Sequence, residues 1–567
     1  KEENAALHVT GTVTDENNLP MAGVSVREKG TSVGTSTDNN GGFSITVGEN
    51  AILEFSYIGF VTQEVAVKDQ QVLSVKLVRS SRQLDQIVVI GYGSQRKKDV
   101  TSAISMVDTK DISSRPIVST AEVLAGKAPG VQVFQPSGKP GSDLSVRIRG
   151  IASALGSSQP IYVIDGIITN DTKGLDPNTI ESINVLKDAS AAGIYGSAGA
   201  TNGVVMITTK KGQRGKNKIE LNTYYGVQKI VKKLDLLNGQ QLANLLEDEK
   251  HNGGDPAFMV DPSLLQTNTD WQDEVYRAAP MLGVNVGFSG GSDKGTFYLG
   301  LGYLNQDGIV KMSNFERYSV KLNLEQNMNK WFTIGTHLNY NRTNSRDVPD
   351  NSRVNQGGVV LGALSTPPFV GKYNPDGTFA MNPFQAWENP LASIEGPFNK
   401  TITNNILGDV YGEVKLPFNL KFRTQFGINT SNYNYDYFLD PFRTQYGRSK
   451  AGIGQNNNGE FFRYTWENTL TYNKSFGDHN ISAVVGTSAI EDKKTDGSQY
   501  GEGFATASIM TLNAASANKS IYTYKSESAL NSYFGRVNYD YNGKYLLTGS
   551  LRADGSSRSG VNNRWGY

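Results

Sequence analysis

The stretch RYSVKLNLE (317–325) alternates apolar and polar residues without a break. Its apolar residues are Tyr318, Val320, Leu322 and Leu324. Successive side chains of a β-strand point to opposite faces, so this strand would have one apolar face and one polar face. A soluble β-sandwich and a membrane β-barrel both alternate in this way, so alternation alone leaves the two open.

The same pattern recurs through the second half of the chain. We expect strands near 218–228, 281–290, 295–305, 317–327, 331–342, 403–415, 419–430, 461–473, 479–490, 529–541 and 544–554. Long connections would cover 229–280, 343–402, 431–460 and 491–528, with an intermediate one at 306–316. The turns between them are short, such as GSDK, NMNK, LPFN, SFGDH and NGK. Short turns on one side and long loops on the other are typical of an outer-membrane barrel.

The expected strands number about eleven, which is odd, and the sequence ends where another strand should begin. An open sheet edge in hydrocarbon would leave backbone groups unpaired, at several kcal/mol each. We therefore expect residues 216–567 to be the first part of a transmembrane antiparallel β-barrel that continues beyond them. Closure by a second chain is the less favoured alternative.

Composition excludes several classes of function. The chain has 567 residues, with 55 Lys and Arg against 54 Asp and Glu, which argues against nucleic-acid binding. It has no cysteine, and its four histidines are scattered, so we expect no metal site and no cofactor. No apolar run approaches the roughly 18 residues of a transmembrane helix. Because the sequence begins with Lys1, we interpret it as a processed exported protein.

Residues 1–79 are expected to form a small β-sandwich. Short alternating runs such as GFSITV and VLSVKLV are separated by turn clusters such as ENNLP and TDNNGG. About 70 residues would supply six or seven strands around one core.

Residues 99–215 are expected to form a compact domain of mixed α and β structure. Ser119 and Glu122 have the spacing of a capping box, and Asp176-Pro177 is a helix-start pattern ahead of NTIESINVLKDAS. Strand-like runs LSVRIRG, PIYVIDGII and GVVMITTKKG lie between them. This domain leads directly into the first long strand, so it would lie on the short-turn side and could fill the barrel as a plug.

Residues 80–98 would link these two domains. They contain the β-prone run Ile87-Val88-Val89-Ile90, followed by Gly-Tyr-Gly and the basic cluster 96–98. The run could be the last strand of the sandwich or the first strand of the next domain. It could equally add a strand to the sheet of a partner, since backbone hydrogen bonds carry the affinity in that mode of binding.

Longer motifs resemble the SusC/RagA family of TonB-linked outer-membrane transporters of Bacteroidetes. They are LDQIVVIGYGSQRKKDVTSAIS, VRIRGIASALGSSQPIYVIDGII and LDPNTIESINVLKDASAAGIYGSAGATNGVVMITTKKG. The N-terminal run GTVTDENNLPMAGVSVREKG is similar to the transthyretin-like regulatory domain of carboxypeptidase D. The fold class expected is therefore mainly β: a sandwich, an α+β plug and about half of a barrel of about 22 strands.

The resemblance implies an importer of the outer membrane, in contact with its lipid, with the sandwich and the linker in the periplasm. TonB, with ExbB and ExbD behind it, would pull on a TonB box. The positions that match are Leu84, Asp85, Gln86, Ile87, Val88, Val89, Ile90, Gly91 and Tyr92. A SusD-like lipoprotein would form a lid over oligosaccharide or oligopeptide substrates, and SusC–SusD pairs could form dimers.

Two segments are candidates for substrate contact. The plug loop supplies Ser153, Ser157, Ser158 and Gln159, and the 343–402 loop supplies Tyr373, Phe384 and Trp387. Aromatic residues of such a loop could also simply pack against one another. Two G-x-S-x-G matches, at 30–34 and 287–291, lack the strand-turn-helix setting of a nucleophile, so we expect no enzyme. A surface adhesin and a structural subunit of a larger outer-membrane complex are the alternative functions.

Overall fold

The computed structural model describes residues 6–31, 33–48, 50–57, 59–68, 70–78, 87–96, 101–108, 117–135, 137–142, 144–153, 157–173, 175–349, 358–383 and 388–567. The chain divides into two compact units. One unit holds Lys1–Ile87 with Arg96–Lys98, and the other holds Val88–Gln95 with Asp99–Tyr567. Among the described residues, no helix combines the length and the apolar character that crossing a membrane as a helix requires.

The first unit is the predicted β-sandwich. Its strands are β1 (Ala6–Thr14), β2 (Ser25–Glu28), β3 (Gly34–Ser36), β4 (Gly42–Gly48), β5 (Ile52–Ser56), β6 (Gln63–Ala66) and β7 (Val72–Lys76). They form two sheets, in the orders β4-β1-β7 and β3-β2-β5-β6. In β4 the alternating residues Phe43, Ile45 and Val47 are buried, because they face the core between the sheets.

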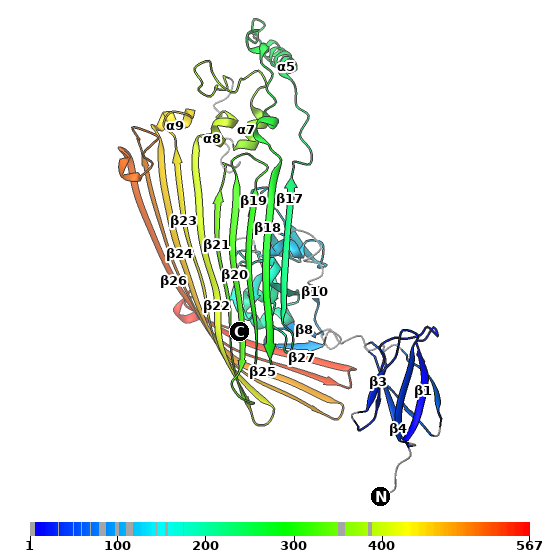
Figure 1. Ribbon diagram of the computed structural model, residues 1–567. Helices are drawn as coiled ribbons and strands as arrows, with labels where there is room; N and C mark the ends of the chain where they lie inside the picture. The colour runs from blue at the N-terminus through cyan, green and yellow to red at the C-terminus, as the bar shows by residue number, and fades with distance from the viewer. Residues whose placement is uncertain are drawn as a thin grey trace. The chain divides into compact units, whose positions relative to one another are not determined.

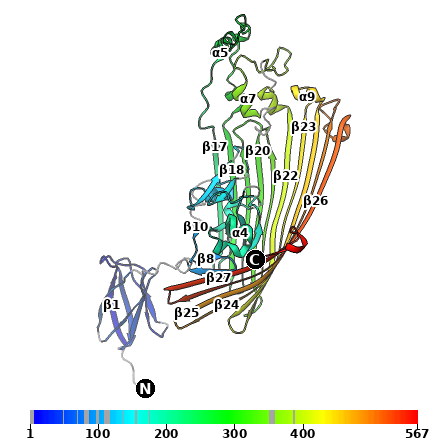
Figure 2. The same cartoon turned by 180° about the vertical axis from the view of Figure 1, so that it is seen from behind.

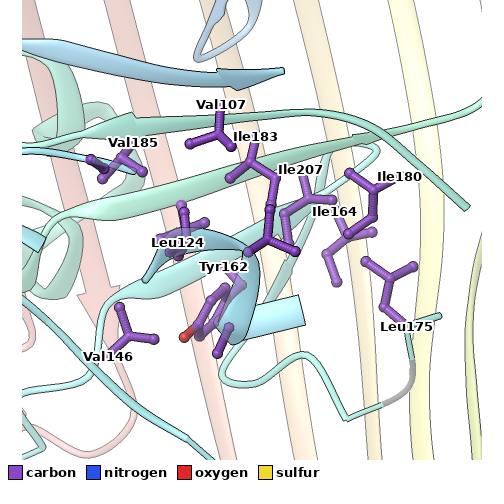
Figure 3. Packing of buried hydrophobic residues seen from close by; sticks show 14 of the residues in the cluster. Val107, Leu124, Val146, Tyr162, Ile164, Leu175, Ile180, Ile183, Val185 and Ile207 are labelled. Carbon is purple, nitrogen blue, oxygen red and sulfur yellow. The ribbon is translucent and has the colours of Figure 1, made fainter. Parts of the chain in front are cut away.

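The plug is built on a five-stranded sheet in the order β10-β15-β16-β13-β14. These strands are β10 (Ile104–Asp108), β13 (Ile161–Ile164), β14 (Ile167–Thr169), β15 (Ile180–Leu186) and β16 (Val204–Thr209). A hairpin of β11 (Val131–Phe134) and β12 (Ser145–Ile148) and the helices α2 (Thr120–Leu124), α3 (Ala189–Ala192), η3 (Gly193–Tyr195) and α4 (Ser197–Asn202) complete it. Leu124 of α2 packs with Tyr162, Ile183 and Ile207 of the sheet in one buried cluster (Figure 3).

One expectation for the plug is wrong. The side chain of Asp176 caps a helical turn as predicted, by accepting a hydrogen bond from the Asn178 amide, but that turn, η2, spans only Pro177–Thr179. The chain then enters strand β15 instead of a longer helix. The reason is tertiary: β15 pairs with β10 on one side and β16 on the other, and both Ile183 and Val185 are fully buried.

Residues from 218 onward form one large antiparallel sheet, twelve strands within the described part of the chain, each paired with the next in sequence. The strands are β17 (Lys218–Gln228), β18 (Ala279–Ser292), β19 (Gly295–Asp307), β20 (Asn314–Asn327), β21 (Phe332–Arg346), β22 (Pro397–Leu416), β23 (Leu420–Leu439), β24 (Ile453–Phe476), β25 (His479–Glu502), β26 (Ala517–Tyr541), β27 (Tyr545–Ser556) and β28 (Trp565–Gly566). Every expected strand is present, and the sheet curves around the plug (Figures 1 and 2).

The connections are segregated as predicted, but two of them are much shorter than predicted. Residues 431–439 and 453–460 belong to β23 and β24, and residues 491–502 and 517–528 belong to β25 and β26. The predicted long connections at 431–460 and 491–528 are therefore wrong in length. The apolar alternation ends near these positions, whereas the backbone ladder continues through Asn-rich and Thr-rich sequence.

The long connections carry helices. These are α5 (Gly239–Asn252), α6 (Trp271–Val275), α7 (Val359–Ser365), α8 (Pro390–Glu395) and α9 (Gln445–Lys450). Figure 1 shows α5, α7, α8 and α9 at the same end of the long strands. Trp271, Val359 and Leu391 share one hydrophobic cluster, so two long connections pack together over this end of the sheet.

Candidate functional site

The linker run forms a hairpin. Strand β8 (Ile87–Ile90) pairs with β9 (Gly93–Arg96) in a two-stranded sheet of its own, apart from the sheets of the sandwich and the plug. Gly91 and Tyr92 make the turn, and Tyr92 has a φ of 57°, a left-handed conformation that bulky residues rarely adopt. A side chain at Gly91 would collide with Ile194 and Tyr195, since a Cβ there would lie 2.9 Å from each. The turn is therefore fitted closely to the plug.

Tyr92 connects this hairpin to the plug and to the wall formed by the long strands. Its hydroxyl donates a hydrogen bond to Oε1 of Glu467 on β24, at 2.8 Å. Its ring stacks on Phe534 of β26, with centroids 4.4 Å apart, and on Tyr195 of the plug, at 5.6 Å. Burial and the Glu467 carboxylate raise the pKa of Tyr92 well above its usual value, so its hydroxyl keeps the donated proton at neutral pH.

A buried ion pair joins the plug to the sheet of long strands at a second position, on β20. Asp165 lies in the turn between β13 and β14, and its Oδ2 accepts hydrogen bonds from Nζ of Lys321 on β20, at 2.9 Å, and from the Thr209 hydroxyl, at 2.6 Å. The two charged side chains are each 2% exposed. Burial is the largest single effect and would raise the pKa of Asp165. The Lys321 ammonium and weaker effects, among them the hydrogen bonds from Lys321 and Thr209, together outweigh burial and hold that pKa well below its usual range.

Arginines of the wall provide a second kind of attachment, each donating to a backbone carbonyl of the plug. Their contacts are Arg317 with Val118 at 2.9 Å, Arg463 with Ile168 at 3.3 Å, Arg536 with Ala191 at 2.8 Å and Arg552 with Ile194 at 2.5 Å. All of these contacts lie on one face of the sheet, the inner face. Hydrogen bonds from charged donors are individually stronger than neutral ones, and each of these also satisfies a backbone acceptor.

These contacts give the hairpin a direct connection to the plug. Tyr195, which stacks on Tyr92, follows Ile194, whose carbonyl binds Arg552. Both belong to η3, which is continuous with α3 and close to α4. A force applied to β8 would therefore act first on Tyr92 and then on η3 and the helices beside it.

The structure separates the predicted site residues. Leu84, Asp85, Gln86, Phe384 and Trp387 lie outside the described residues, and for residues 87–90 the structure describes the backbone as β8. Ser157 and Gln159 lie on the plug, where the Ser157 carbonyl accepts from the Asn202 amide and Gln159 bonds to Ser145. Ser153 and Ser158 lie in the same loop and are partly buried. Tyr373 lies instead in a long connection, where its ring packs against that of Phe379 at a tilt of 34°.

Sequence reasoning missed Glu467 as a partner of Tyr92, and Asp165 with Lys321. The only sequence signal for them is a charged residue on the polar face of an alternating strand, at Lys321 and Glu467. That signal does not indicate which residue of the plug or the linker each of them contacts.

Comparisons with known proteins agree with this architecture. The family described as TonB-dependent Receptor Plug Domain matches residues 96–204, and the CarboxypepD_reg-like domain matches residues 9–89. TonB-dependent receptor P3 of Formosa agariphila is 36% identical over 99% of this chain and 56% of its own length. TonB-dependent receptor SusC of Bacteroides thetaiotaomicron is 31% identical over 99% of this chain and 57% of its own length. The chain thus spans a little more than half the length of these relatives.

Solved structures extend the likeness to three dimensions. The RagAB peptide importer in its open-open state superposes with a TM-score of 0.73 and 26% identity, over 85% of this chain and 57% of that one. A plug inside a curved antiparallel sheet, preceded by a small sandwich, is the fold of a TonB-dependent receptor. Within that class the chain is similar to the SusC-like receptors, which it matches along almost its entire length. Both relatives are named as TonB-dependent receptors.

Proposed function

We propose that this chain is the plug-bearing part of a TonB-dependent importer of the outer membrane, energised through residues 84–92. The outer membrane has no ATP, and its pores prevent a useful ion gradient. Uphill import therefore needs mechanical work from the inner membrane, where each charge that crosses 100 mV supplies about 2.3 kcal/mol. The sandwich, the hairpin and the short turns would face the periplasm, and the long connections would face outward.

The observation that carries this proposal is the β8 hairpin. Among the described residues β8 has one strand neighbour, β9, so its other edge is not paired with a strand there. A partner such as TonB would bind there by strand addition, through backbone hydrogen bonds. Gly91 and Tyr92 are packed against the plug, so we assign strand addition to residues 84–90 and anchoring to 91–92.

The anchor explains how a pull would reach the plug. Local unfolding costs less than global unfolding, so a pull on β8 would first release Tyr92 and then loosen η3 and its neighbours. The ion pair of Asp165 and Lys321 would hold the rest of the plug in place. A path would thus open along one side of the plug, on the side of β24 to β27.

The similar proteins support a proposal for the partner and the substrate class as well. RagAB is named as a peptide importer, and this name supports a substrate of oligomeric type; we add a SusD-like lid over the long connections to the proposal. Pairing of two such complexes and energy supply by ExbB and ExbD belong to the same proposal. Oligosaccharides and oligopeptides are the two substrate classes in question.

Proline scanning of β8 tests the function. Proline has no N–H to donate, and the N–H groups of Val88 and Val89 point to opposite edges of β8. One of the two variants, Val88→Pro or Val89→Pro, therefore removes a donor that faces TonB, and it should weaken TonB binding about tenfold. Val88→Ala and Val89→Ala keep the backbone donors and are the matched controls. The affinity of the purified C-terminal domain of TonB for the detergent-solubilised full-length receptor would be measured. Equal affinity of all four variants would refute strand addition at β8.

A further inference from the structure

The outer face of the sheet of long strands is the one that points away from the plug. On β24, β26 and β27 it carries exposed apolar side chains, each next in sequence to an inner-face residue, Glu467, Arg536 or Arg552. They are Trp466, Val537 and Leu551, and each is more than half exposed. Exposed apolar side chains on one face of such a sheet are those that meet lipid.

Two neighbouring short turns lie where this apolar band ends, away from helices α5, α7, α8 and α9 (Figure 1). One joins β24 to β25 at residues 477–478, and the other joins β26 to β27 at residues 542–544. The register brings them together, because Phe476 lies opposite His479 and His479 lies opposite Tyr541. These turns and the residues beside them carry the turn cluster, which consists of Lys474, Phe476, His479, Tyr539, Tyr541 and Lys544.

The aromatic side chains of the turn cluster pack around His479. The His479 ring stacks on Phe476, with centroids 5.2 Å apart and planes 15° apart, and it contacts the Tyr541 ring at 4.9 Å. Nδ1 of His479 and the Tyr539 hydroxyl share a hydrogen bond of 2.7 Å. Phe476 and Tyr541 are still 46% and 37% exposed, so part of this ordered aromatic surface faces outward. Aromatic side chains with a polar edge are enriched at the level of lipid headgroups, where they meet both the apolar and the polar zone.

The charged side chains of the two turns favour an anion. Lys474 and Lys544 are exposed, and neither makes an ion pair with a residue that the structure describes. The Asp540 carboxylate is buried, and it accepts hydrogen bonds from the Gly543 amide at 2.7 Å and from the side chain of Asn480 at 3.1 Å. Within residues 472–481 and 539–547 the exposed acidic side chain is Asp478, so two ammonium groups face one carboxylate.

We propose that the turn cluster binds the headgroup of an anionic phospholipid, an inference that rests on the proposed function because that function places the short turns at the periplasmic leaflet. The acyl chains would lie along the apolar outer face, past Val537 and Leu551. Lys474 and the turn that carries Lys544 are about 10 Å apart across the sheet, a gap that two extended lysine side chains span to meet one phosphate. A lipid with a phosphate and no ammonium group complements both lysines, whereas phosphatidylethanolamine brings an ammonium group that they repel. The ordered rings would hold the glycerol region, since an ordered surface loses less entropy on binding.

The test compares the wild type with two double variants of the full-length receptor in a non-ionic detergent. Bound lipid would be counted by native mass spectrometry during titration with phosphatidylglycerol and, separately, with phosphatidylethanolamine. The wild type should retain phosphatidylglycerol in preference. Lys474→Gln/Lys544→Gln should weaken its binding about tenfold or more, because both cations are lost. Lys294→Gln/Lys330→Gln removes an exposed lysine from each of two other short turns, and this matched control should bind normally.

Three results with these lipids would overturn the proposal: equal retention of both by the wild type, phosphatidylglycerol binding that survives the change at Lys474 and Lys544, or equal weakening in the control variant. Displacement of the lipid by an excess of inorganic phosphate would also overturn it, because the rings and the apolar face would then contribute nothing. Fractionation of the receptor with the outer membrane would be measured in the same cells. Normal fractionation without a lipid preference leaves the import function standing, whereas a receptor absent from that fraction would count against the function itself.

Discussion

Tyr92 is the residue at which the linker hairpin, the plug and the sheet of long strands meet. Replacing it with Phe removes one hydrogen bond to a buried carboxylate, worth about 1.5–3 kcal/mol. Replacing it with Ala also removes two ring stacks. We expect faster amide hydrogen exchange across residues 87–96 in Tyr92→Phe and faster still in Tyr92→Ala. Tyr57→Phe, on the surface of the sandwich, is the control and should leave that exchange unchanged.

The ion pair of Asp165 and Lys321 gives a second prediction at this scale. Asp165→Asn or Lys321→Met alone leaves one buried charge without a partner, which typically costs about 3–5 kcal/mol of unfolding free energy. The double variant lacks both charges, so its loss of unfolding free energy should be smaller than the sum of the losses in the two single variants. Denaturant unfolding in detergent measures all three, and a fully additive double variant would show that the pair does not act as a unit.

The pH dependence of this pair follows from the lowered pKa of Asp165. A carboxyl group with a lowered folded pKa stabilises the protein above its unfolded pKa, about 3.9 for Asp. The contribution is lost only as the pH falls through the lower folded value. The difference in stability between wild type and Asp165→Asn should therefore be the same at pH 7 and pH 5, and a difference that disappears by pH 5 would contradict the assignment.

Whole strands show where a sequence pattern stops being informative. The alternation in 317–325 predicted β20 because its inner face meets the polar plug and its outer face is apolar. In the upper part of β23 tyrosines alternate with Asn and Asp, and the upper part of β24 is rich in Asn, so neither repeats the alternation of aliphatic and polar residues seen in β20. The backbone ladder nevertheless continues, since its hydrogen bonds do not depend on side-chain polarity. The sequence pattern also failed to predict strand β15, because an Asp-Pro helix start precedes it.

The extended strands give a prediction at the scale of elements. Amides of residues 431–439 and 453–460 should exchange slowly, like those of the lower parts of the same strands, because they belong to one continuous ladder. The connection at 440–452 should exchange faster, apart from helix α9. Hydrogen-exchange mass spectrometry resolves these segments. Uniformly fast exchange through 431–460 would instead support a loop.

At the scale of the whole molecule, the site depends on contacts that no local pattern contains. Tyr92 and Glu467 are 375 residues apart in sequence, and Asp165 and Lys321 are 156 apart. Such pairs meet only after the plug has docked against the strands, so the sequence predicted the fold class but not these contacts. The linker run shows the opposite case, because residues 87–90 have the β-branched character that their strand requires.

The central claim is that β8 takes TonB as a neighbouring strand, and cysteine cross-linking tests it most directly. The chain contains no cysteine, so single cysteines at positions 84–92 report without background from this part of the receptor. Each would be paired in cells with a cysteine on the edge strand of the C-terminal domain of TonB. We predict disulfide cross-links at 84–90 that alternate in strength along the strand, and none at a Tyr225→Cys control on β17. Absence of cross-links throughout 84–90, or equal cross-linking at the control, would contradict the account.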